Sequence, residues 1–290
     1  MNNKVKYIMS SKNKTLEEYQ KAGEEMFQKL HLDSFPVSIK YIKDLENNIP
    51  PGVRRPIDDG DKMSICQAFT YARRFSQKLC ITAADNFCTP SSVAHGWVPL
   101  TMEEFTESQV RQKWSKDVQA EKRRAEHTYA NNFKNIMDLA YRGVIVSPLT
   151  ETPVIPDAIM IYCDGPKLTY IINALNYEHK RKYRIQSTFE GFGESCAKGG
   201  LMPFITRKAQ IVIPGTGDRS FAGIQDHELG IGMPASFIFY VLKNLFQTGA
   251  GQGLRFPLRQ ILPKLDENLT PGFKYMREVI DKKLKDNNKI

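Results

Sequence analysis

The sequence predicts an α/β protein: a single two-lobed domain with a mixed sheet, flanking helices and an internal pseudo-duplication. Short apolar runs bounded by turn residues alternate with segments of helical periodicity, as α/β folds require. The segment Ala235–Phe246 is apolar all round, which is typical of a buried helix, and Pro234 suits its first turn. With 290 residues, 41% of them hydrophobic, the chain can bury a sizeable core.

Capping signals place the first elements. Thr15-Leu-Glu-Glu18 is a capping box that opens a helix, and the alternating run over 36–42 predicts a strand. A loop rich in proline and glycine over 47–62 then leads to a helix over 65–75. A strand over 78–82 and a loop over 85–95 follow.

The middle of the chain is expected to be one long helical region. A second capping box at Thr101–Glu104 opens it, and the polar stretch 107–128 should face solvent. Gly143 should stop it. Its buried end is marked by five apolar or aromatic residues, Phe133, Ile136, Met137, Ala140 and Tyr141.

The second half repeats the alternation of strands and helices. Apolar runs over 144–146 and 158–162 predict strands, and a helix is expected over 168–175. A strand over 184–188, a glycine-rich loop and a strand over 210–213 follow. The helix-borne triplets Phe69-Thr-Tyr71 and Leu168-Thr-Tyr170 occupy matching places in the two halves, which is the basis for the pseudo-duplication.

The predicted domain spans 15–262, with lobes at about 15–143 and 144–262. A basic N-terminal tail (1–14) and a basic C-terminal helix or tail (263–290) flank it. These two ends carry six of the nine net positive charges, so the basic character is not concentrated on a nucleic-acid surface. We therefore do not expect nucleic acid as a partner.

The compartment indicated is the cytoplasm. No apolar run reaches the roughly 18 residues of a membrane span. The lysines near the N-terminus are not followed by the apolar segment of a signal peptide. Five cysteines, an odd number, without a CxxC pair argue against a disulfide framework and against the commonest zinc-ribbon and thioredoxin motifs.

Three of the cysteines are the candidate site. Cys66 opens the helix over 65–75, Cys88 follows a strand among turn-forming residues, and Cys196 lies in the glycine-rich loop GFGESCAKGG. We expect them to converge. Cys80 and Cys163 lie inside apolar strands and are interpreted as core residues.

Several segments resemble a family of mainly prokaryotic proteins, many from anaerobes, catalogued as domain of unknown function 169. They are CQAFTYARR, the Cys88 loop, VSPLTETPVIPDAIMIY, the Cys196 loop and GTGDRSFAGIQDHELGIGMP, within about 36–247. The resemblance implies that Cys66, Cys88, Cys196 and Arg219 occupy family positions. It implies no particular reaction.

Three thiols on separate segments suit a [4Fe–4S] cluster with one iron open to a substrate or a non-cysteine ligand. Zinc held by the three cysteines with His95 or His227 uses the same ligands, and three buried thiols without any metal are the remaining interpretation. The function expected first is therefore a cysteine-ligated metal protein, which binds a small anionic ligand or works with a redox partner protein in anaerobic metabolism.

Arg219, in a glycine-rich loop, is the candidate for holding an anion, with its guanidinium directed into the cysteine cleft. Its alternative is an ion pair with Asp218 or Asp226. Lys198 would favour a thiolate at Cys196, and Asp226 completes the candidate ligand-binding set. A metal-free small-molecule or thiol-redox protein and a non-catalytic interaction subunit remain alternatives, and a homo-oligomer is left open.

Overall fold

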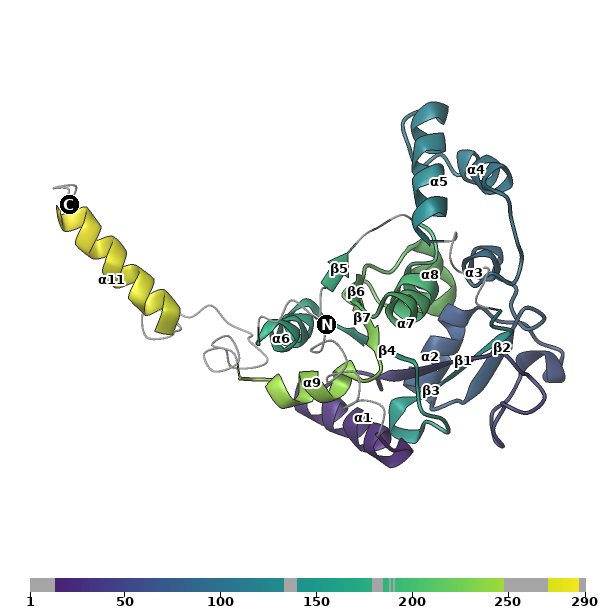
Figure 1. Ribbon diagram of the computed structural model, residues 1–290, viewed down its shortest axis with the longest axis horizontal. Coiled ribbons are helices and arrows are strands. Elements are labelled where there is room, and N and C mark those ends of the chain that lie inside the picture. The colour runs from purple at the N-terminus through teal and green to yellow at the C-terminus, as the bar shows by residue number, and fades with distance from the viewer. Residues whose placement is uncertain are drawn as a thin grey trace, which may run out of the picture.

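The computed structural model describes residues 14–132, 140–178, 185–187, 189, 191–247 and 271–286. Its centre is one seven-stranded sheet of order β2-β3-β1-β4-β7-β6-β5 (Figure 1). β5 and β6 are parallel, and the other neighbouring strands are antiparallel. The predicted α/β class with a mixed sheet in a single domain is therefore confirmed.

The strands are short. Their bounds are β1 Val37–Ile42, β2 Leu79–Thr82, β3 Gly143–Pro148, β4 Ala158–Cys163, β5 Ile185–Ser187, β6 Ala209–Val212 and β7 Leu229–Pro234. The α-helices are α1 Leu16–Leu30, α2 Ile65–Phe75, α3 Thr89–Ala94, α4 Met102–Val110, α5 Val118–Asn132, α6 Gly165–Asn176, α7 Met202–Thr206, α8 Thr216–Ala222, α9 Phe237–Asn244 and α11 Pro271–Asp286. The 3-10 helices η1 Pro56–Asp59 and η3 Leu149–Glu151 and the π-helix η4 Glu194–Leu201 complete the described elements.

The sheet is covered on both faces because alternate residues of its central strand point to opposite cores. In β4, Met160 and Tyr162 belong to one core with α2 and η4, while Ile159 and Ile161 belong to the other with α1, α6 and α9. Figure 1 shows α1, α6 and α9 gathered on one side and α2, α7 and α8 on the other. A strand buried on both faces reads as a continuous apolar run, which is why β4 was easy to predict.

The two predicted capping boxes are present, and a third one opens α2. Thr15 caps α1 reciprocally with Glu18, and Thr101 caps α4 with Glu104. In α2, Ser64 accepts from the Gln67 amide and the Gln67 side chain accepts from the Ser64 amide. Each of these caps involves residues only three apart, so the sequence alone contains the whole signal.

The internal repeat does not correspond to a twofold axis. β1 and β4 are antiparallel neighbours at the centre of the sheet, but α2 and α6, the helices that follow them, pack on opposite faces. A twofold axis normal to the sheet would keep the two helices on one face. The strand β1 also lies between β3 and β4, so a single sheet joins residues from both predicted lobes.

The middle of the chain differs from the prediction. The expected loop over 85–95 contains α3, and the expected long helix is two helices, α4 and α5, separated by residues 111–117. Gly143 begins β3 instead of ending a helix. The predicted buried residues Phe133, Ile136 and Met137 lie outside the described residues, as do 1–13 and 248–270.

β7 was missed because its sequence, LGIGMP, contains two glycines and a proline, which normally indicate a turn. Pro234 ends β7 and is not part of the following helix, which begins at Phe237. The glycines are required by packing. A Cβ on Gly232 would lie 1.9 Å from the carbonyl oxygen of Gly199 in η4, so only glycine lets the π-helix backbone rest on the sheet.

Arg73, in the last turn of α2, is buried in the core. Its guanidinium donates to both carboxylate oxygens of Glu228, with Nη2–Oε2 2.8 Å, and lies 4.4 Å from the centre of the Tyr162 ring. This pair joins α2 to the segment that leads into β7. A buried bidentate pair of this kind is costly to break because it leaves an uncompensated charge.

Of the helices that the structure describes, none has both the length and the apolar composition needed to cross a membrane.

The glycine contact gives the first testable prediction. Gly232→Ala forces a methyl group into the Gly199 backbone, so the free energy of unfolding should fall by at least about 2 kcal/mol, measured by chemical denaturation. Gly165→Ala is the matched control because a Cβ there meets no atom within 4 Å, and its effect should stay within about 0.5 kcal/mol. Equal stability of the two variants would contradict the proposed contact.

Candidate functional site

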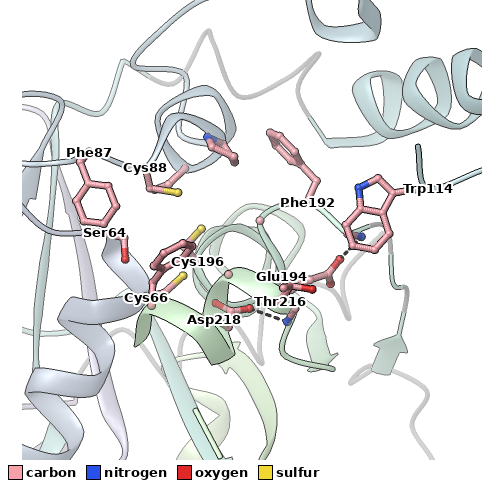
Figure 2. A pocket seen from close by; sticks show the side chains of 17 residues that line it. Ser64, Cys66, Phe87, Cys88, Trp114, Phe192, Glu194, Cys196, Thr216 and Asp218 are labelled. Carbon is pink, nitrogen blue, oxygen red and sulfur yellow. Dashed lines mark hydrogen bonds between the residues drawn. The ribbon is translucent and has the colours of Figure 1, made fainter. Parts of the chain in front are cut away.

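The three predicted cysteines line one cavity of about 330 Å³. Cys66 comes from the start of α2, Cys88 from the residue before α3, and Cys196 from η4. Figure 2 shows their three sulfur atoms turned toward the same space. The expected convergence is therefore present although 130 positions separate the first cysteine from the last.

Cys66 is held by the start of α2. It is the second residue of the helix, directly after the reciprocal cap between Ser64 and Gln67. The helix is in turn tied to α8, since Gln67 Nε2 donates to the Phe221 carbonyl and Thr70 Oγ1 donates to the Ala222 carbonyl at 2.7 Å. These hydrogen bonds set the distance between α2, which carries the Cys66 thiol, and α8.

The Cys88 segment is ordered by side chains that bond to its backbone. Asn86 Oδ1 accepts from the Cys88 amide at 3.2 Å, and Asn86 Nδ2 donates to the Cys88 carbonyl at 2.9 Å. The fully buried Asp85 accepts from the amides of Thr82 and Ile57. The half-buried thiol of Cys88 thus projects from a fixed turn.

The glycine-rich sequence suggested that Cys196 lies on a loop, and the structure differs from this expectation. Cys196 lies in the π-helix η4 and is only 2% exposed. The Lys198 amide donates a hydrogen bond to the Gly193 carbonyl, five residues back, at 3.0 Å, which is the wide spacing that defines a π-helix. Gly199 and Gly200 allow this helix to press against Met160 and Tyr41, so the glycines serve packing and not flexibility.

The site is acidic. Of the described residues around the cavity, two are carboxylates, Glu194 and Asp218, and none is Lys, Arg or His. Asp218 is 6% exposed, accepts from the Gly215 amide at 2.9 Å, and forms no ion pair within the described chain. No cationic side chain around this cavity therefore supports the expected anionic ligand.

This environment disfavours thiolates. The pKa of Cys66 is raised well above its ordinary value, first by its hydrogen bond with Cys196, then by burial and by the charge of Asp218. The pKa of Cys88 is raised to about 11, mainly by burial and then by the proximity of Cys196. Without a bound cation, these two sulfurs are neutral thiols at physiological pH.

Lys198 does not line the cavity. Its ammonium forms a buried ion pair with Glu194, Nζ–Oε1 3.3 Å, and the same oxygen accepts from the Gly191 amide at 2.9 Å. Lys198 therefore acts on the site through Glu194, which does line the cavity. Its expected role as a direct partner of the Cys196 thiolate has no support in this geometry.

Arg219 does not point into the cysteine cavity, which corrects the prediction. Its Nη1 donates to the Gln225 carbonyl at 2.8 Å and lies 3.5 Å from Oδ1 of the fully exposed Asp226. Neither Arg219 nor Asp226 lines the cavity. Two other residues of α8 line the cavity instead: Asp218, directly before the arginine, and Phe221, two positions after it.

The two histidines considered as a fourth zinc ligand lie elsewhere. His95 is buried, its Nδ1 is 2.8 Å from the Ser91 carbonyl, and burial lowers its pKa to about 4. His227 is exposed beyond α8. Within the described residues, no three His, Cys, Asp or Glu side chains are arranged to hold one metal ion.

Aromatic residues at the mouth were missed by the sequence reasoning. Phe87, Trp114, Phe192 and Phe221 line the cavity, and in Figure 2 Phe87 lies across it from Trp114. Phe87 is next to Cys88 in sequence and Phe192 is close to Cys196, so nearness to a candidate cysteine could have identified these two aromatic residues. No such sequence signal pointed to Trp114, because it lies in a polar segment far from any cysteine in sequence.

The comparisons with known proteins identify a family but no activity. The family model described as DUF169, uncharacterised ArCR, matches residues 25–244. That range contains every residue assigned above to the cavity. No curated protein and no solved structure matches the chain.

The electrostatics of the site give the second prediction. Asp218→Asn removes a negative charge beside Cys66, so the pKa of that thiol should fall and its alkylation by iodoacetamide at pH 8 should become at least about threefold faster. Peptide mass spectrometry of the metal-free protein measures this rate.

Asp226→Asn is the control for this prediction, since it removes the same charge from a fully exposed position outside the cavity and should leave the Cys66 rate unchanged. An unchanged rate in the Asp218 variant, with native circular dichroism, would show that the carboxylate does not control this thiol.

Proposed function

The chain belongs to the uncharacterised family DUF169, and we propose that it binds a thiolate-ligated metal centre, an iron–sulfur cluster, in the cysteine cavity. Cys66, Cys88 and Cys196 are its proposed ligands. The observation that carries the proposal is the gathering of three thiols and an unneutralised carboxylate around one cavity that no cationic side chain of the described chain lines.

The argument rests on charge. Bringing thiols and a carboxylate together away from water is costly, and the cost appears here as the raised pKa values of Cys66 and Cys88. A bound metal reverses this effect, because coordination holds thiols in the deprotonated form. A cation is therefore the ligand that would relieve the electrostatic cost of this site.

Geometry favours a cluster over a single zinc ion. Zinc with Zn–S bonds near 2.3 Å needs its sulfur ligands within about 4 Å of one another. No ligand group for one ion is assembled among the described residues, whereas the three cysteines surround a cavity of about 330 Å³. A cluster uses thiolates as ligands and places several metal ions between them.

Three cysteines leave one position of a four-iron cluster for another ligand. Asp218 is the proposed non-cysteine ligand, since it lines the cavity and interacts with Cys66. A bound cluster would supply electron transfer or a Lewis-acidic iron. The chain's own residues fix the thiols at the start of α2, directly before α3 and in η4, and cover them with aromatic side chains.

A metal-free thiol function is the second candidate. It is supported by the position of Cys66 and Cys196, which line the same cavity and interact strongly enough to raise the pKa of Cys66, as expected for two neighbouring thiols of a dithiol centre. The raised pKa of Cys66 argues against it, because the thiolate is the nucleophile in disulfide exchange. Metal analysis separates the two candidates.

The third prediction tests the cluster. Protein purified without oxygen should be brown and contain iron and acid-labile sulfide. Cys88→Ala should lose most of the iron because it removes one of three ligands from a half-buried position. Cys80→Ala is the control, since Cys80 is buried in β2 and does not line the cavity, and it should keep its iron.

Circular dichroism establishes that both variants are folded. Zinc in place of iron would redirect the proposal to a zinc centre. Metal-free protein with an oxidisable Cys66–Cys196 pair would favour the dithiol function. Equal iron in the Cys88 and Cys80 variants would rule out Cys88 as a ligand.

A further inference from the structure

We propose that the mouth of the cysteine cavity binds a compact organic cation with apolar substituents, of the methylated ammonium type. This inference concerns the aromatic and carboxylate lining of the cavity in the metal-free protein, in which Asp218 is not engaged as a cluster ligand. It replaces the small anion expected from the sequence.

The mouth is aromatic. Phe87, Trp114 and Phe221 come from three separate segments and line the cavity, and Phe192 lines the same cavity from the core, where it is only 9% exposed. Phe87 and Trp114 are each 49% exposed, and Phe221 is 66% exposed. Large apolar side chains that flank a cavity and remain exposed are typical of a surface that a ligand covers.

Trp114 is held in place within residues 111–117, the connection between α4 and α5. The next residue, Ser115, donates its amide to the buried carboxylate of Glu121 at 2.6 Å, and Arg124 bridges Glu121 to Gln109 of α4. The indole packs over Gly191, where a Cβ would lie only 3.4 Å from its ring and where φ is +69°. The polar stretch 107–128 thus has a definite role, which is to present one aromatic ring to the cavity.

The charge of the mouth selects the ligand. Glu194 is already paired with Lys198, whereas Asp218 is buried and forms no ion pair in the described parts of the chain. An anion would meet a carboxylate and no lining cationic side chain. A cation with apolar substituents is attracted both by the carboxylate and by the faces of aromatic rings, which is how proteins recognise quaternary ammonium groups.

Three probes of one shape and different charge test this. Choline carries a positive nitrogen, 3,3-dimethyl-1-butanol replaces that nitrogen by carbon, and 3,3-dimethylbutanoate is the corresponding anion. By titration calorimetry, choline should bind at least about tenfold more tightly than the alcohol, and the anion should not bind. Trp114→Ala should weaken choline binding at least about tenfold, because it removes one wall of the mouth.

Phe75→Ala is the matched control, since Phe75 is 63% exposed on α2 and does not line the cavity, and it should leave choline binding unchanged. Asp218→Asn should weaken choline binding and leave that of the alcohol unchanged. Both measurements use metal-free protein, because Asp218 is also the proposed ligand of the cluster. The iron and sulfide assay on protein purified without oxygen tests the metal proposal separately, so failure of either proposal stays distinguishable.

Equal binding of choline and alcohol, unchanged binding in Trp114→Ala, or no binding of choline at about 10 mM would overturn the proposal.

Discussion

The structure depends on a backbone contact between the π-helix η4 and the strand β7. The Gly199 carbonyl lies where a Cβ of Gly232 would be, and Gly230 similarly leaves room for Met160 beside it. This contact allows an eight-residue helix to lie directly on the sheet. Because Glu194 and Cys196 belong to that helix, the same contact brings one carboxylate and one thiol to the cavity.

The second constraint is electrostatic. The core that surrounds the cysteines contains acidic groups and thiols, and two buried cations beside it, Arg73 and Lys198, are paired with Glu228 and Glu194. The raised pKa values of Cys66 and Cys88 consequently keep these two thiols protonated in the protein alone. Any ligand that brings positive charge gains from the same environment that penalises thiolates, which unites the proposed metal centre and the proposed organic cation in one physical argument.

The polar stretch 107–128, which includes parts of α4 and α5, shows how a polar segment can be essential to a site. Its sequence suggested a helix that faces solvent. Yet Glu121 is buried, holds the turn that carries Trp114, and is fixed by Arg124. The aromatic wall of the cavity therefore depends on a buried ion pair whose members are 3 residues apart in a helix.

The sequence by itself determined the elements whose signals are local. The helices α1 and α2 and the strands β1, β2 and β4 were predicted because caps, apolar periodicity and turn residues act over a few positions. The family resemblance and the loop-like settings also indicated that Cys66, Cys88 and Cys196 converge. Only the tertiary structure decided that Gly230 and Gly232 belong to a strand, that Cys196 is buried in a helix, and that Arg219 points outward to Asp226. These outcomes depend on contacts between distant segments, where the space left by one backbone determines which residue fits in another.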